Sequence, residues 1–339
     1  MQPRLKPIAT IVRSSSKGNR KTMDHCTARW RGSLSGGAKA RLISARAGFT
    51  LIEFLVAIGI IAILMGILIP YVLATREMSR RTECASRIGQ IGIALQQYAN
   101  DVGPHNLLPQ TVYDAVHFPA GYTAFTGADD NNPFAKDSKV RGNDVTASLW
   151  LLVRLEDVKD TSVFTCPSTS DEPDEMLDAN GKLTSPTHRG NFRSSSNLSY
   201  SYASPFTDAA DYVFSSDRLV SEFAVLADRN PGFEGLLNDT QVLGPTRDAP
   251  PFELARGNSQ NHGQAGQNVL HPAGNVSFET TPYCGVAHDN IYTAVAQHRL
   301  VNAHPALDVP GYLGTGIGAA YEYDSYLVPT ARDVAPGDR

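Results

Sequence analysis

The distribution of apolar residues predicts a long helix near the start of the chain. Positions 54–75 form a run of 22 residues without a charged side chain, and roughly 20 such residues span the hydrocarbon core of a bilayer. Beyond this run, apolar residues recur mostly at steps of three and four, as on one face of a helix: Met78, Ile88, Ile91, Leu95 and Tyr98. Gly103 and Pro104 then provide a stop signal. We therefore predict one helix over residues 49–100 that lies in a membrane to about residue 75.

The rest of the chain shows shorter apolar segments separated by polar ones. We expect strands at 163–166, 198–203, 223–227, 267–270 and 276–279, the last two paired across a turn in which Gly274 has a positive φ. Residues 148–155 read as a buried helix or strand, and residues 113–141 and 168–197 as loops. A helix followed by antiparallel strands predicts an α+β fold, with residues 101–339 forming one head domain.

One acidic residue, Glu53, lies just inside the apolar helix. A carboxylate at this depth is costly unless it has a partner. Residues 48–53, Gly-Phe-Thr-Leu-Ile-Glu, resemble the processing site of type IV prepilins. The resemblance implies that a prepilin peptidase/methyltransferase cleaves between Gly48 and Phe49 and methylates the new amine. It also implies that Glu53 is the assembly residue, paired with the amine of a neighbouring subunit, and that Pro70 kinks the helix as in pilins.

Two other interpretations of the apolar run compete with processing as a prepilin. A plain membrane anchor would explain neither Glu53 nor the Gly48–Phe49 junction. A secretory signal peptide cleaved after Ala74 would need a shorter apolar region, because such regions are typically 7 to 15 residues long. We therefore favour the prepilin interpretation.

The charge distribution predicts the orientation in the membrane. Eleven of the 30 basic residues and one of the 34 acidic residues lie in residues 1–48, a Ser/Gly-rich leader with a net charge of +10. This charge would hold the N-terminus in the cytoplasm of a single-pass protein of the inner membrane. Met23 is an alternative start that gives a shorter leader. The remaining 19 basic and 33 acidic residues give the mature chain a net charge of −14, which argues against nucleic-acid binding.

The exported part of the chain would contain three cysteines, Cys84, Cys166 and Cys284, because Cys26 leaves with the leader. One disulfide and one free thiol are compatible with an oxidising compartment, and the sequence does not give the pairing. Since none of these cysteines has the local spacing of a zinc site, we expect structural cysteines and no bound metal.

A second resemblance covers the later part of the chain, to prepilin-like proteins of planctomycete-type bacteria with a His-x9-Asp-Gly element. His262 and Gly274 match its ends, but ten residues follow His262 before the Asp position, which holds Ala273, and Asn275 stands where the family often has His. We therefore assign the element no chemistry and retain only the turn. Supporting pieces are Arg81-x-x-Cys84, Phe164-x-Cys166-Pro167, Tyr200-Ser-Tyr202, Ala227-Asp228-Arg229 and Asp289-Asn-Ile-Tyr292.

The sequence does not indicate an enzyme. His262 with Asp228, Arg229 or Asp289 would supply acid–base groups, and Ser199, Ser201 or Ser259 a nucleophile, but no motif places them together. The acidic runs at 129–132 and 171–175 offer oxygen ligands for calcium, without the spacing of an EF-hand loop. We expect solvated loops there and no cofactor.

The resemblance thus implies a processed, N-methylated subunit of a type IV pilus-like filament or of the pseudopilus of a type II secretion system. Its partners would be the peptidase and other pilin or pseudopilin subunits. The head would lie in the periplasm or on a surface filament. The alternative is a membrane-anchored periplasmic binding or scaffold protein that is processed in the same way and never polymerises.

Overall fold

The computed structural model describes residues 50–102, 104–111, 144–178, 180–206, 212–231, 246–293, 300–301, 304–305 and 323–328. The chain divides into two compact units, one ending at Gly59 and one running from Ile60 to Arg339. Helix α1 (Leu51–Asp101) includes residues of both units. The predicted loop at 113–141 and the acidic run at 129–132 lie outside the described residues.

Helix α1 begins with a reciprocal capping arrangement. The Thr50 hydroxyl accepts a hydrogen bond from the Glu53 backbone N–H (3.2 Å), and the Thr50 N–H donates to Glu53 Oε2 (2.8 Å). These two bonds satisfy backbone donors that a helix start otherwise leaves without partners. The helix continues through Pro70 without a break in its assignment.

The second half of α1 packs on the head through one face. Its buried residues are Cys84, Ile88, Ile91, Gly92, Ala94, Leu95, Tyr98 and Ala99, which recur at the three- and four-residue steps of a helical face. Met78 was predicted on this face, but it is 66 % exposed. That assignment is wrong because the buried face begins only at Cys84.

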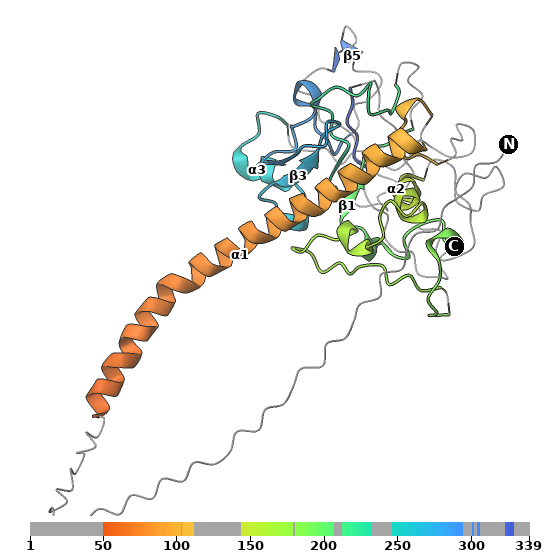
Figure 1. Cartoon of the computed structure of the whole chain (residues 1–339). Helices are drawn as coiled ribbons and strands as arrows, with labels where there is room; N and C mark the ends of the chain where they lie inside the picture. Colours follow the sequence, from red (N-terminus) through yellow and green to blue (C-terminus); the bar gives the residue numbers. More distant parts are fainter. Residues whose placement is uncertain are drawn as a thin grey trace, which may run out of the picture. The chain divides into compact units, whose positions relative to one another are not determined.

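The head is built on a four-stranded antiparallel sheet in the order β1 (Tyr200–Tyr202), β2 (Leu226–Asp228), β3 (Gln267–Leu270), β4 (Val276–Glu279). The last two strands form the predicted hairpin, with Val269 opposite Ser277. The α+β expectation is confirmed (Figure 1). A separate pair joins β5 (Leu300–Val301) and β6 (His304–Pro305).

The segment predicted at 148–155 as a helix or a strand belongs to helix α2 (Val145–Arg154). Asp144 caps this helix, because its carboxylate accepts a hydrogen bond from the Ala147 N–H. Residues 145–153 are all buried, so the segment shows no alternation of buried and exposed positions. For this reason the sequence pattern could not distinguish a helix from a buried strand. A short helix α3 (Pro251–Arg256) lies in the described part of the chain before β3. The 3-10 turns are η1 (Pro104–Asn106), η2 (Thr161–Phe164), η3 (Pro186–His188), η4 (Ser195–Asn197), η5 (Gln260–His262) and η6 (Val286–His288).

Two expectations in the middle of the chain are corrected. The segment predicted as a strand at 163–166 contains the end of η2, which Asp160 caps through the Ser162 N–H. The supposedly exposed loop at 168–197 contains a fully buried ion pair between Asp174 and Arg189, with Nη2–Oδ2 at 2.6 Å. A polar composition indicated exposure, but a paired charge can be buried.

Candidate functional site

The first candidate site is the N-terminal half of α1. Gly48 and Phe49 lie outside the described residues, and Glu53 stands one turn inside the helix. Glu53 Oε2 accepts hydrogen bonds from both the N–H and the hydroxyl of Thr50, each at 2.8 Å. Both donors are uncharged. They form hydrogen bonds with the carboxylate, but neither offsets its negative charge.

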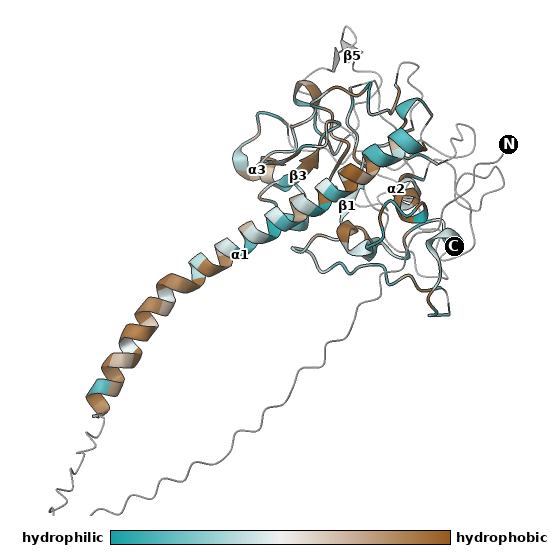
Figure 2. Ribbon diagram, in the orientation of Figure 1, coloured by the Kyte–Doolittle hydropathy of each residue, from teal (hydrophilic) through white to brown (hydrophobic). Residues whose placement is uncertain are grey.

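The apolar side chains of this half have no covering partner within the described residues. Most of those from Leu51 to Leu73 are about half exposed or more, Leu51 by 81 % and Ile67 by 71 %, whereas Ala57 and Val72 are half-buried. By length and composition, α1 is the one helix in the described part of the chain that is suited to cross a membrane. Figure 2 shows its apolar first half and its mixed second half.

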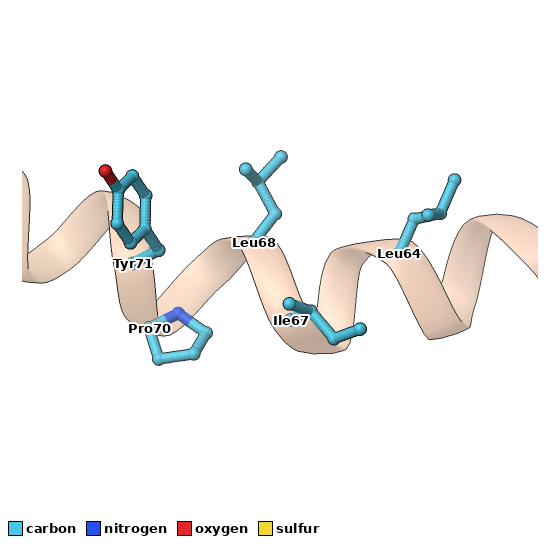
Figure 3. A pocket seen from close by; sticks show the side chains of 5 residues that line it. All are labelled: Leu64, Ile67, Leu68, Pro70 and Tyr71. Atoms are coloured by element: carbon cyan, nitrogen blue, oxygen red, sulfur yellow. The ribbon is translucent and has the colours of Figure 1, made fainter.

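Pro70 lies in the middle of this apolar surface. A shallow depression there is lined by Leu64, Ile67, Leu68, Pro70 and Tyr71, all on one helix (Figure 3). Proline removes one backbone hydrogen bond of the helix. Because these side chains project from a single helix, the surface is suited to contact with lipid or with another helix.

The second candidate site surrounds His262, and it is formed by four separate segments. Cys84 projects from α1, Cys166 follows η2, Asp228 ends β2 and His262 ends η5. One ligand atom from each lies within 4.8 Å of the other three, and all four residues are buried. The structure thus brings together two predicted groups, His262 and Asp228, with two cysteines that the sequence had not connected to them.

The contacts inside this group are close. The Cys84 thiol donates to Asp228 Oδ1 (3.1 Å), and His262 Nε2 lies 3.3 Å from Asp228 Oδ2 and 3.7 Å from Cys166 Sγ. On the other side of the ring, His262 Nδ1 lies 2.8 Å from Oε1 of Glu77 on α1. The imidazole therefore turns Nδ1 toward the Glu77 carboxylate and Nε2 toward the Asp228 carboxylate and the Cys166 sulfur.

Electrostatics favour charge separation among these groups. A hydrogen bond from Cys84 lowers the pKa of Cys166 to about 6, against the effect of burial. Burial alone would lower the pKa of His262, but its bonds to Asp228 and Cys166 outweigh this and raise the pKa to about 10. Burial raises the pKa of Cys84 far above its usual value. Without a further ligand, the group therefore favours a Cys166 thiolate beside a protonated His262.

The remaining candidate catalytic groups are placed elsewhere or have other partners. Arg229 pairs with Asp171 at 2.6 Å, and Ser199 donates to the same carboxylate at 2.5 Å. The Ser201 hydroxyl accepts from the Asn230 N–H, and Ser259 accepts from the Asn261 N–H. Asp289 accepts from the Ser325 N–H, and burial together with the nearby Asp324 raises its pKa. No nucleophile–base pair is formed by these serines and His262 in the described contacts.

The acidic run at 171–175 already has cationic partners. Asp171 pairs with Arg229, and Asp174 forms two bonds of 2.6 Å to Arg189. The expected solvated loop is wrong for Asp174, which is buried with Arg189, and these ion pairs would compete with calcium for the carboxylates.

Gly274 and the turn lie away from His262, at the opposite end of β3. Gly274 has φ +85° in the loop Pro272–Gly274, and its N–H donates to the His271 carbonyl. Three-residue hairpin loops commonly place glycine at such a left-handed position. Ala273 is exposed on this loop. The substituted Asp position therefore belongs to the turn, whereas His262 belongs to the buried group.

Cys84, Cys166 and Glu77 are the site residues that sequence reasoning missed. Their separation along the chain hides the group, since ligand motifs are recognised by short spacing. A signal did exist, because Cys84, Cys166, Asp228 and His262 each lie in one of the short pieces noted above. The expectation of structural cysteines stays a prediction, but Cys84 and Cys166 lie together beside Asp228 and His262. The described cysteines, Cys84, Cys166 and Cys284, are free thiols.

Comparison with known families identifies the N-terminal segment. Residues 43–69 match the family described as "Prokaryotic N-terminal methylation motif". No curated protein and no solved structure matched the chain in the corresponding searches. The matched segment contains the Gly48–Phe49 junction, Glu53 and most of the apolar half of α1. The N-terminal segment is thus prepilin-like, and the proteins of this family are structural subunits rather than enzymes.

Proposed function

We propose that this prepilin-like chain is a processed and N-methylated subunit whose helix α1 assembles with other pilins or pseudopilins. The assembly would be a type IV pilus-like filament or a type II secretion pseudopilus. A prepilin peptidase/methyltransferase would cleave before Phe49, and the head would act as a non-enzymatic structural domain in the periplasm or on the filament.

The observation that carries this proposal is the exposed apolar half of α1 with one charged residue at its start. An all-round apolar helix requires partners outside its own chain. Lipid supplies them before assembly, and the equivalent helices of other subunits would supply them in a filament. The basic leader supports an orientation with the N-terminus in the cytoplasm.

The local role of Glu53 must be separated from its proposed assembly role. Its two bonds to Thr50 stabilise the helix start, which by itself is a reason for a Glu or Gln at this position. Only pairing with the amine of a neighbouring subunit requires the negative charge. A buried charge without a counter-charge is unfavourable. If Glu53 acts through its charge, a neutral substitution should prevent assembly. If it acts only as a helix cap, a neutral side chain that still accepts hydrogen bonds should be tolerated.

Two variants make this separation in the native host. Glu53→Gln retains an acceptor for the cap and removes the charge, whereas Thr50→Ala removes the capping hydroxyl and retains the charge. We expect Glu53→Gln to abolish incorporation into filaments, as seen by shearing and immunoblotting, with cleavage intact. Thr50→Ala should still assemble. Incorporation of Glu53→Gln at the level of the unmodified chain would contradict the charge-pairing role of Glu53, and absence of the unmodified chain from the sheared filaments would favour the anchored, non-polymerising alternative.

Mass spectrometry of the mature N-terminus tests the processing step separately. We expect a chain that begins with N-methylated Phe49. A chain that begins at Thr75 would show cleavage as a signal peptide, and an intact leader would show a plain membrane anchor.

A further inference from the structure

The buried group formed by Cys84, Cys166, Asp228 and His262 has the composition and geometry of a metal site. Their ligand atoms lie within 4.8 Å of one another, and all four residues are buried. We propose that these four side chains bind one zinc ion in a closed site that fastens α1 to the head. This inference is independent of the proposed filament function, since it concerns only residues of the second unit.

The distances fit tetrahedral coordination. Zinc bonds of about 2.3 Å to sulfur and about 2.0–2.2 Å to nitrogen and oxygen separate neighbouring ligand atoms by about 3.3–3.8 Å. The observed separations are 3.7 Å from Cys166 Sγ to His262 Nε2, 3.3 Å from His262 Nε2 to Asp228 Oδ2 and 3.1 Å from Cys84 Sγ to Asp228 Oδ1. All four ligand atoms lie within 4.8 Å of one another, so side-chain adjustments of up to about 1 Å would bring them to tetrahedral separations around one ion.

The donor atoms favour zinc over the hard cations. Two thiolates, one imidazole and one carboxylate form a set that suits Zn²⁺, whereas calcium and magnesium prefer oxygen ligands alone. The ion would also offset buried charge. Among the described residues no lysine or arginine pairs with Asp228, and two thiolates beside it would be strongly unfavourable without a cation.

The surrounding residues orient the ligands as in known zinc sites. Glu77 Oε1 lies 2.8 Å from His262 Nδ1, so a proton on Nδ1 leaves the lone pair of Nε2 on the side of Asp228 and Cys166. The side-chain amide of Asn268 lies 3.2 Å from Nε2 there, and a bound ion would take its place as the partner of the lone pair. Asn261 donates its amide to Asp228 Oδ1 (2.9 Å), and the Asn268 N–H donates to Oδ2 (2.7 Å). These bonds hold the carboxylate in place and leave part of its acceptor capacity for a metal.

Two other uses of the same residues explain less of the arrangement. A Cys84–Cys166 disulfide would leave His262 and Asp228 facing it without a role. A catalytic Cys166–His262 pair would need room for a substrate, but Cys166 is 1 % exposed, and Cys84 and Asp228 occupy the space beside the imidazole. Four protein ligands without an open position are typical of a structural zinc site.

The test uses the full chain purified in detergent micelles without added metal. Elemental analysis should find about one zinc per chain, as a closed four-ligand site predicts. His262→Ala and Cys166→Ser should lose the zinc, and Cys284→Ser, which alters a thiol outside the cluster, should keep it. Replacement by cobalt should give the visible absorption of a tetrahedral site with thiolate ligands. Glu77→Gln should weaken zinc binding roughly 10–100-fold in a chelator competition, because Glu77 contacts the four ligands only through His262.

A second measurement applies if the ligand variants fail to fold. Removal of the zinc from the unmodified chain by a strong chelator should lower its Tm, and added zinc should restore it, because a ligand that binds the folded state stabilises it. The proposal is overturned if the folded, reduced chain carries no zinc and binds none when zinc is added. It is also overturned if mass spectrometry of the chain from native membranes finds a Cys84–Cys166 disulfide, or if His262→Ala folds and keeps its zinc.

Discussion

The two halves of α1 differ in where their side chains find partners. From Leu51 to Leu73 the large apolar side chains are exposed, and Glu53 has hydrogen bonds to Thr50 alone. From Cys84 to Ala99 eight residues are buried against the head. Both stretches are helical, so secondary structure does not distinguish them. Periodicity does, because the first half is apolar on all sides and the second on one face.

This difference shows which interactions the chain completes by itself. The head pairs buried charges within the chain, such as Asp174 with Arg189. The first half of α1 leaves its apolar surface uncovered by the described residues. Substitutions in the head and the second half of α1 should therefore change folding stability, and those in the first half should change insertion or assembly.

The largest effect on stability is expected for Asp174→Ala. Both partners of this ion pair are fully buried, so the substitution leaves the Arg189 guanidinium without its carboxylate. Loss of one partner of a buried pair costs about 3–5 kcal/mol. Urea unfolding of the full chain in detergent, followed by tryptophan fluorescence, measures this. The control is Glu83→Ala, which breaks the exposed Glu83–Arg87 pair and should cost about 0.3–0.5 kcal/mol. Equal losses would contradict the distinction between buried and exposed pairs.

A somewhat smaller effect should follow from Ile91→Ala in the second half of α1. Ile91 is fully buried, whereas Ile93, two positions away, is 62 % exposed. A buried Ile→Ala change costs about 2–5 kcal/mol, while Ile93→Ala should stay within about 0.5 kcal/mol of the unmodified chain. The same urea titration compares them. A similar loss for both would mean that the head does not bury one face of α1.

Acidification should weaken the head through Asp174 by less than the alanine substitution does. Burial raises the pKa of this carboxyl, but the hydrogen bonds and charge of Arg189 outweigh it and hold the pKa below its usual value of 3.8. The ionised pair thus stabilises the fold above this value, and the contribution is lost as the pH falls through the lower, folded-state pKa. Urea midpoints between pH 6 and pH 3 should decline less steeply for Asp174→Asn. Parallel declines would exclude Asp174 as a source of acid sensitivity.

Much of the fold could be predicted from patterns that are local in sequence. The apolar run and the three- and four-residue steps gave α1 to within two residues at each end, and alternating segments around Gly274 gave the β3–β4 hairpin. These elements depend on neighbouring residues, which is why they can be recognised. Residues 163–166 and Met78 were misassigned because tertiary packing, rather than local preference, decided their state.

The buried ligand group could not be assembled from sequence for a related reason. Each residue comes from a different element, and only the packing of α1 on β2 and η5 brings Cys84 next to Asp228 and His262. Spacing rules describe sites within one loop or helix. The N-terminal motif is the opposite case, because its residues from Gly48 to Glu53 are consecutive in the sequence.

The smallest effects are expected for two glycines that contrast the halves of α1 directly. A Cβ on Gly92 would lie 2.8 Å from Leu270 Cδ1, and Leu270 is itself buried, whereas a Cβ on Gly66 would have no neighbour within 4 Å. Alanine favours a helix over glycine by about 1 kcal/mol, and overpacking in a core costs about 1–3 kcal/mol. Gly92→Ala should therefore lower the stability of the head by up to about 2 kcal/mol, and Gly66→Ala should leave it unchanged in the urea titration. A stabilised Gly92→Ala variant would show that α1 does not approach β3 this closely, and a destabilised head in Gly66→Ala would show that the apolar half is packed within the chain after all.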